Sequence, residues 1–211
     1  MKNKYVSFIT DDHFLDCIGN LHRSYIRAKN NITKKNFYKN KVDTIKLTFD
    51  AKFNDINEED LIQSEILRQV DKSINNSIGT FHEQILGGVP GFEIGNFSDF
   101  DIKASDDSLF ATFGSTEITK NISEGVFEIL ANKARLYVSS KFYYVLIDDD
   151  SDTNEKWVIG NEEYSVSQKR VFKISIKQLY KEVTKQENAY QLLCKVLPTV
   201  CEDYLSIQQP S

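Results

Sequence analysis

The stretch Glu58–Leu86, EEDLIQSEILRQVDKSINNSIGTFHEQIL, carries the clearest structural signal in this sequence. Asn57 precedes it as a natural N-cap, and the acids that follow suit the positive end of a helix dipole. Apolar residues then recur every three or four positions, at Ile62, Ile66, Val70, Ile74, Ile78, Phe81 and Ile85. This period predicts one long amphipathic helix that ends at the pair Gly87-Gly88.

Working outward, the pattern predicts a helix before this stretch and alternating strands and helices after it. The earlier helix covers about Asp11–Ala28, and the short apolar segment around Leu47 stays open between helix and strand. Strands are expected at Leu109–Phe113, Phe142–Ile147, Trp157–Ile159 and Val171–Ile176. Further helices are expected at Asn121–Lys133, Ile176–Thr184 and Glu187–Ser206, the last with a kink or break at Pro198. Helices around a central cluster of strands predict an α/β fold, with α+β as the alternative.

Composition bounds the class of protein. A chain of 211 residues suits one domain, 1–211, and 40 % apolar with 12 % aromatic residues is enough for a packed core. No apolar run reaches the roughly 18 residues that a membrane span needs, and the N-terminus lacks a signal peptide's apolar stretch. We therefore expect a cytoplasmic protein. Three cysteines without CxxC spacing argue against a disulfide framework or a zinc site, and we expect them to be buried.

Charge is distributed unevenly along the chain. The net charge is −5, whereas a nucleic-acid-binding module is usually basic. Yet the segment 20–48 holds eight basic residues and one acid, and the segment 148–163 holds seven acids and one base. The first segment could face an anion such as DNA through Lys34, Lys35, Lys39 and Lys41. The second segment is too acidic to face an anion.

Several stretches, in order and across nearly the whole chain, carry a resemblance to a known family. They are Tyr5–Asp12, Lys35–Asn40, Phe49–Ala51, Glu65–Gln69, Asn76–His82 with Ile85–Gly87, and the block from Leu179 to Pro198. Together they resemble a family of type II restriction endonucleases whose better-known members cut GGNCC sites. The resemblance implies a PD-(D/E)xK nuclease: a restriction-endonuclease-like central mixed sheet flanked by helices, Mg²⁺ as cofactor, and double-stranded DNA as partner. It also implies a homodimer, or a heterodimer with a related subunit, since such enzymes act on two-fold symmetric sites.

The chemistry of that superfamily sets the spacing of its residues. One Asp at a strand start and an acid on the next strand hold the metal, which activates water and offsets charge on the phosphate. A Lys two residues beyond the acid lies on the same strand face, because side chains alternate with period two. Here Asp101, in Phe100-Asp-Ile-Lys103, matches the first Asp and is the candidate metal ligand.

The second half of the motif departs from the family. Thr112 stands where the family's acid belongs, Gly114 where its Lys belongs, and Thr80 where an acid is common on the long helix. A threonine hydroxyl is a poor Mg²⁺ ligand and glycine supplies no ammonium, so these changes indicate a degenerate site. An acidic run, Asp148–Asp152, replaces the family's basic loop, and phosphate repulsion argues against DNA contact at that edge.

Three functions remain open from the sequence. The first is a degenerate nuclease-fold protein of a restriction-modification or other defence system that still binds DNA. The second is an active Mg²⁺-dependent site-specific deoxyribonuclease with migrated ligands, for which the candidate residues are Asp101, Glu83, Asp99, Asp107 and Glu117, with Lys103 or Lys120 replacing the lost Lys. The third is an accessory or interaction protein that presents its acidic segment to a basic partner without binding DNA.

Overall fold

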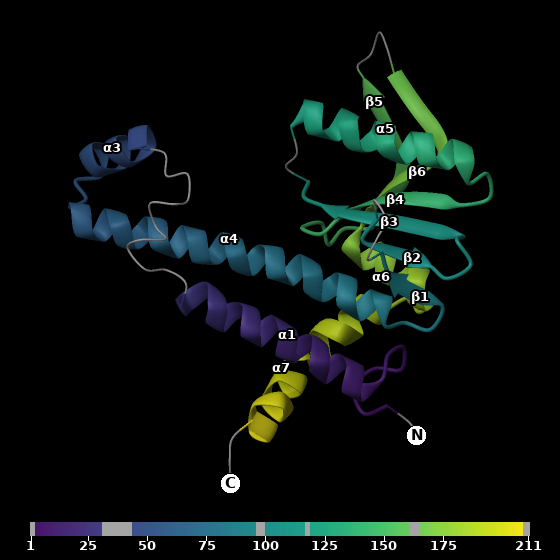
Figure 1. Cartoon of the computed structure of the whole chain (residues 1–211), viewed down its shortest axis with the longest axis horizontal. Helices are drawn as coiled ribbons and strands as arrows, with labels where there is room; N and C mark the ends of the chain where they lie inside the picture. Colours follow the sequence, from purple (N-terminus) through teal and green to yellow (C-terminus); the bar gives the residue numbers. More distant parts are fainter. Residues whose placement is uncertain (1–2, 31–43, 96–99, 117–118, 161–164, 209–211) are drawn as a thin grey trace. The chain divides into compact units, whose positions relative to one another are not determined.

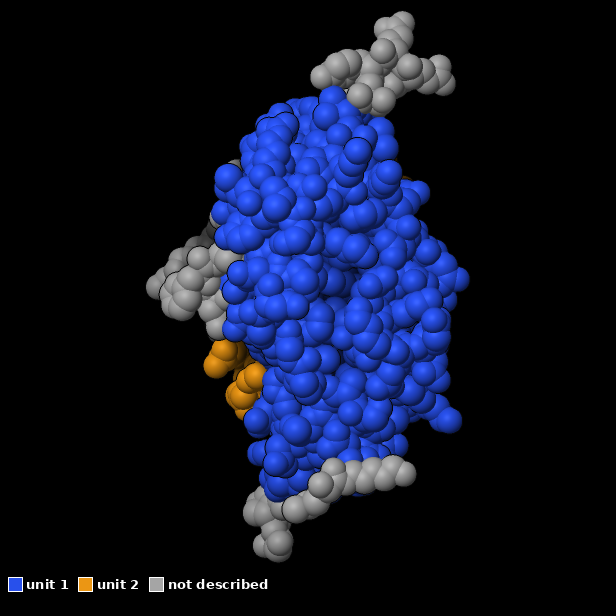
Figure 2. Space-filling view, turned by 90° about the vertical axis from the view of Figure 1, so that its right-hand side faces the viewer, with its two compact units in different colours: residues 1–17, 82–211 blue, residues 18–81 orange. Residues whose placement is uncertain are grey.

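A computed structural model describes residues 3–30, 44–95, 100–116, 119–160 and 165–208. The chain divides into two compact units, one of residues 1–17 with 82–211 and the other of residues 18–81 (Figure 2). Helices α1 (Asp11–Asn30) and α4 (Glu58–Gly87) each run through the division from one unit into the other.

All the regular secondary structure described in the smaller unit is helical. Besides portions of α1 and α4, it holds α3 (Thr44–Phe53), so the segment that the sequence left open is a helix. The predicted N-cap of the long helix is confirmed, because the backbone N–H of Asp60 donates to Oδ1 of Asn57 at 2.9 Å.

The larger unit is built on a six-stranded mixed sheet. Its strands are β1 (Phe92–Ile94), β2 (Ile102–Ala104), β3 (Leu109–Gly114), β4 (Lys141–Leu146), β5 (Asn154–Gly160) and β6 (Ser165–Ser175). They lie in the order β1-β2-β3-β4-β6-β5. The inner strands β3, β4 and β6 are parallel, and the remaining neighbours are antiparallel. The carboxyl ends of three strands therefore meet at one edge of the sheet.

Helices cover both faces of this sheet (Figure 1). Helix α5 (Lys120–Leu136) packs on one face through Phe127 and Leu130, against Phe142 and Trp157. Helix α6 (Ile176–Thr184) lies on the other face and is followed by α7 (Ala189–Gln208). Strand β4 is buried on both faces, as expected for a central strand of a parallel region.

The observed architecture confirms the predicted α/β, restriction-endonuclease-like fold. Most predicted helices and strands are present within a few residues, whereas the short strands β1 and β2 were not predicted. Helix α7 continues through Pro198, so of the expected kink or break at that residue, the break is absent. Cys17 is buried, but Cys194 is exposed, which corrects the expectation that all three cysteines are buried. None of the described helices is both long and apolar enough to span a membrane.

Candidate active site

Asp101 lies beside the carboxyl end of β3. It directly precedes β2, whose antiparallel register pairs Ile102 with Ala111, and its backbone N–H donates to the Ala111 carbonyl at 3.0 Å. Oδ2 of Asp101 accepts two hydrogen bonds, from the Thr112 hydroxyl at 2.9 Å and from the Phe113 backbone N–H at 2.6 Å. This carboxylate is therefore fixed to β3, the strand that carries Thr112 and Gly114.

Glu83 is the second acid of this neighbourhood. It lies near the C-terminal end of α4, within the same unit as Asp101, and its side chain is partly buried. Burial, together with the negative charge of Asp101, raises the pKa of Glu83 to about 7. Two of the sequence-predicted acids thus interact electrostatically.

The side chain of Tyr144, on the neighbouring strand β4, reaches Gly114. A Cβ built on Gly114 would lie 2.0 Å from the Tyr144 hydroxyl oxygen and 2.4 Å from Cζ. Tyr144 is buried, its ring lies 4.8 Å from that of Trp157, and its hydroxyl donates to the Ser115 carbonyl at 3.1 Å. The space in which a side chain at position 114 would begin is therefore filled by a well-anchored ring.

In the described part of the chain, neither Lys103 nor Lys120 is seen to replace the lysine that the family pattern has at position 114. Nζ of Lys103 lies 3.0 Å from both Glu93 Oε1 and Asp107 Oδ1, so its ammonium is paired with two carboxylates other than Asp101. The side chain of Lys120, like Asp99 and Glu117, lies outside the described residues. The predicted DNA-binding residues Lys34, Lys35, Lys39 and Lys41 lie outside them as well.

The described side chains do not fit the family's magnesium site. Mg²⁺ favours oxygen ligands in near-octahedral geometry and is usually held by carboxylates and substrate phosphates. Asp101 already uses Oδ2 for two hydrogen bonds, and Glu83 carries a raised pKa that favours its neutral form. Among the residues described, no group of three or more His, Cys, Asp or Glu side chains could hold a metal ion.

The acidic loop after β4 is tied to its surroundings. Asp148 accepts hydrogen bonds from the Ser115 hydroxyl at 2.6 Å and from the Thr116 backbone N–H at 2.8 Å. It therefore links the end of β4 to the end of β3, and these hydrogen bonds outweigh burial and keep the pKa of Asp148 below its usual range.

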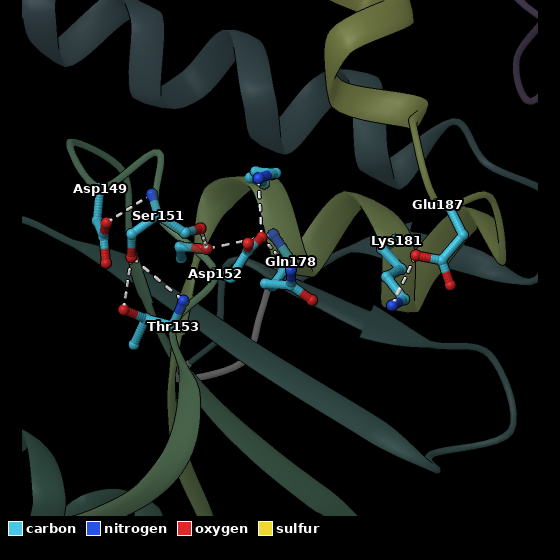
Figure 3. A network of polar contacts seen from close by, with 9 residues as sticks. Asp149, Ser151, Asp152, Thr153, Gln178, Lys181 and Glu187 are labelled. Atoms are coloured by element: carbon cyan, nitrogen blue, oxygen red, sulfur yellow. Dashed lines mark hydrogen bonds and ion pairs between the residues drawn. The ribbon is translucent and has the colours of Figure 1, made fainter.

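The remainder of this loop contacts the start of α6 (Figure 3). Asp152 lies 2.8 Å from the Lys177 ammonium, which lowers its pKa, and it also accepts a hydrogen bond from Gln178 at 2.8 Å. Asp149 accepts from the Ser151 backbone N–H at 2.8 Å. These acids therefore have structural partners in the turn and in α6, which the sequence pattern did not reveal.

His82, next to Glu83, is a buried hydrogen-bonded residue. Its Nδ1 lies 3.0 Å from the Tyr180 hydroxyl, and burial lowers the pKa of His82 to about 4. The residue that sequence reasoning missed is Tyr144. The approach of its ring to Gly114 depends on strand order, and the run FYYVL gives no signal for it beyond a buried strand.

Comparison with known proteins identifies the family of this chain. A model of the Eco47II restriction endonuclease family matches residues 6–206. The chain belongs to the Eco47II restriction endonuclease family. It is 33 % identical over 222 residues to the type II restriction enzyme Sau96I of Staphylococcus aureus, an alignment that covers 99 % of this chain and 84 % of that enzyme. No solved structure matches the chain significantly.

Membership of the Eco47II family confirms the resemblance on which the site residues were chosen. Type II restriction endonucleases act on double-stranded DNA and generally use Mg²⁺. In this structure Thr112 contacts Asp101, and the Tyr144 ring fills the space beside Gly114.

Proposed function

We propose that this member of the Eco47II family binds double-stranded DNA within a restriction-modification or other defence system and that its Mg²⁺-dependent nuclease site is degenerate. One observation carries the proposal. Oδ2 of Asp101 accepts hydrogen bonds from Thr112 and Phe113, and Thr112 stands where the resemblance places the family's second acid. Because α1 and α4 pass through both units, we treat residues 1–211 as one domain.

The neighbouring position supports the same proposal. Gly114 provides no ammonium to assist attack on the phosphate, and Tyr144 occupies the space that a lysine's Cβ would need. Lys103 does not substitute for it, because Glu93 and Asp107 hold its ammonium. Loss of a metal ligand and of the assisting cation removes both sources of charge stabilisation in the transition state.

DNA binding in this proposal rests on the basic segment. Lysine–phosphate contacts release counterions, so affinity falls as salt rises. The four lysines at positions 34, 35, 39 and 41 are the candidates, whereas the acidic loop at Asp148–Asp152 lies at the carboxyl edge of the sheet. We therefore assign phosphate contact to the segment before α3 and not to that loop.

The binding proposal is tested by fluorescence anisotropy with duplexes that contain or lack a GGNCC site, at several salt concentrations. We expect salt-dependent binding, and substitution of the four lysines by Ala should lower the salt slope by up to about 3.6, or 0.9 for each lost contact. The matched control replaces four other lysines, Lys141, Lys156, Lys169 and Lys195, which are exposed and whose loss changes net charge equally. Equal losses in both variants, or no binding at low salt, would contradict the proposal.

A second candidate function is supported by the electrostatic interaction between Glu83 and Asp101. Two carboxylates close enough to interact are a feature of Mg²⁺-dependent nucleases, in which substrate phosphates complete the metal coordination. In this alternative the chain is an active site-specific deoxyribonuclease with migrated ligands. Cleavage of DNA with Mg²⁺ that is lost in both Glu83→Gln and Asp101→Asn would favour it.

A further inference from the structure

A buried carboxylate on α4 holds two polar side chains in place. The Glu65 side chain is 6 % exposed, and its oxygens accept hydrogen bonds from Nε of Arg68 at 2.7 Å and from Nη2 of Arg68 at 2.6 Å. Oε1 of Glu65 also accepts a hydrogen bond from the Gln69 amide at 3.0 Å. The bonds from Arg68 outweigh the effect of burial and keep the pKa of Glu65 below its usual range. Glu65 therefore stays ionised and anchors both neighbours.

This ion pair differs from an ordinary surface pair. In an ordinary pair both groups are exposed, and the pair contributes little because two flexible side chains must be ordered. Here the carboxylate is buried, while the Arg68 side chain is 51 % exposed. Helix α4 thus buries one charge and leaves half of its partner in solvent. The result is a guanidinium that faces solvent in a fixed orientation, since both of its bonds to Glu65 lie in one plane.

The bidentate geometry decides which edge of the guanidinium is available. A guanidinium has five N–H donors, and the bonds to Glu65 use the one on Nε and one of the two on Nη2. The edge formed by Nη1 and the second donor of Nη2 has no hydrogen-bond partner among the described residues. This edge offers two parallel donors, which fit two neighbouring acceptors. Guanine presents such a pair, O6 and N7, in the major groove of DNA.

The charge of the smaller unit favours a polyanion as partner. Residues 18–81 contain eleven Lys and Arg and eight Asp and Glu, a net charge of +3, whereas the rest of the chain has a net charge of −8. On α4, the exposed residues Lys72 and Asn76 follow Arg68 at four-residue steps, so the three lie along one side of the helix. The major groove admits an α-helix. This side of α4 therefore carries the residue types that a helix uses to contact DNA bases and phosphates.

We propose that Arg68 contacts guanine in the major groove of double-stranded DNA and that Glu65 is the residue that positions it. The proposal rests on the DNA binding proposed above and names one contact that gives this binding a sequence preference. The outer edge of the guanidinium donates to O6 and N7 of one guanine, while Glu65 keeps the guanidinium plane fixed. A lysine at position 68 could not replace it, because an ammonium is a point charge without a planar fork.

Modified bases test the contact at the level of one atom. Replacing the guanines of a GGNCC duplex by 7-deazaguanine removes N7 and leaves the phosphates and the Watson–Crick edges unchanged. The affinity of the parent protein, measured by fluorescence anisotropy, should fall at least about fivefold, the lower end of what one bidentate base contact contributes. Arg68→Lys keeps the charge but loses the fork. Its affinity for the unmodified duplex should be lower, and 7-deazaguanine should then have no further effect.

Two further variants separate this contact from general effects of substitution. Arg135→Lys changes an exposed arginine of α5, in the larger unit, and should respond to 7-deazaguanine as the parent does. Glu65→Gln keeps the size of the side chain but removes the charge that orients Arg68, so it should reduce the effect of 7-deazaguanine. Because Glu65 is buried, far-ultraviolet circular dichroism is used to check that this variant is folded.

The outcomes distinguish this proposal from the proposed DNA binding. A parent protein that binds both duplexes equally would overturn the guanine contact and leave DNA binding intact. The same conclusion would follow if Arg68→Lys lost as much affinity with 7-deazaguanine as the parent does. A parent protein that binds neither duplex at low salt would overturn both proposals.

Discussion

The Thr112 hydroxyl donates a 2.9 Å hydrogen bond to Oδ2 of Asp101, so a neutral donor on β3 holds the carboxylate that precedes β2. Two acids at these positions would repel one another and be held together by a cation. A hydroxyl and an acid instead attract each other directly. The Thr112 hydroxyl and the Phe113 backbone N–H therefore hold Oδ2 of Asp101 on β3.

The first prediction concerns Mg²⁺. A ligand that binds the folded state raises the unfolding temperature by mass action. Because the described acids do not form the family's site, we expect the unfolding temperature to be the same with Mg²⁺ and with a chelator. Differential scanning fluorimetry measures this. An increase with Mg²⁺ that disappears in Asp101→Asn would show that the carboxylates bind the ion.

A second prediction concerns the space at Gly114. Gly114→Ala places a methyl group against the buried ring of Tyr144, and overpacking of this kind costs about 1–3 kcal/mol. Denaturant unfolding of Gly114→Ala, Tyr144→Ala and the double variant measures the coupling. We expect the alanine at 114 to cost less when Tyr144 is absent. Additive effects would mean that the two positions do not compete for space.

A third prediction concerns the pKa of Glu83. Burial and the charge of Asp101 raise this pKa to about 7. Asp101→Asn removes the charge but keeps an oxygen acceptor, so the pKa of Glu83 should fall part of the way toward 4.5, and burial should keep it above that value. Carbon-13 NMR titration of the Glu83 carboxyl measures the shift. Asp107→Asn removes an acid paired with Lys103 and should leave the pKa of Glu83 unchanged.

A fourth prediction concerns the pH dependence of stability at His82. Its folded pKa of about 4 lies below the ordinary value of 6.5, so the unfolded state takes up the proton first as pH falls. The stabilisation is full above pH 6.5 and is lost as pH falls toward 4, by about 3 kcal/mol at 1.36 kcal/mol per pKa unit.

Comparison of variants isolates this contribution, because Glu83 has a raised pKa and acts in the opposite direction. His82→Gln cannot titrate but keeps polar atoms toward Tyr180. Its free energy of unfolding, measured by urea denaturation, should fall less than that of the parent between pH 6.5 and pH 4. Identical slopes for parent and variant would contradict burial as the cause.

The sequence predicted the main elements because their apolar residues follow a clear period. The long helix from Glu58 and the buried strand around Tyr143 are examples. The short strands β1 and β2 escaped prediction because three residues carry too little periodicity. The Thr112–Asp101 bond and the Tyr144–Gly114 approach depend on strand order and register, which no local pattern encodes.

The most direct test of the central claim is a cleavage assay of the purified protein on unmethylated plasmid DNA rich in GGNCC sites, with Mg²⁺ or Mn²⁺. Asp101→Ala is the control for any contaminating nuclease. The account predicts that the DNA stays intact under conditions in which the protein binds it. Discrete fragments produced by the parent protein and absent with Asp101→Ala would contradict the account and show that the site cleaves DNA.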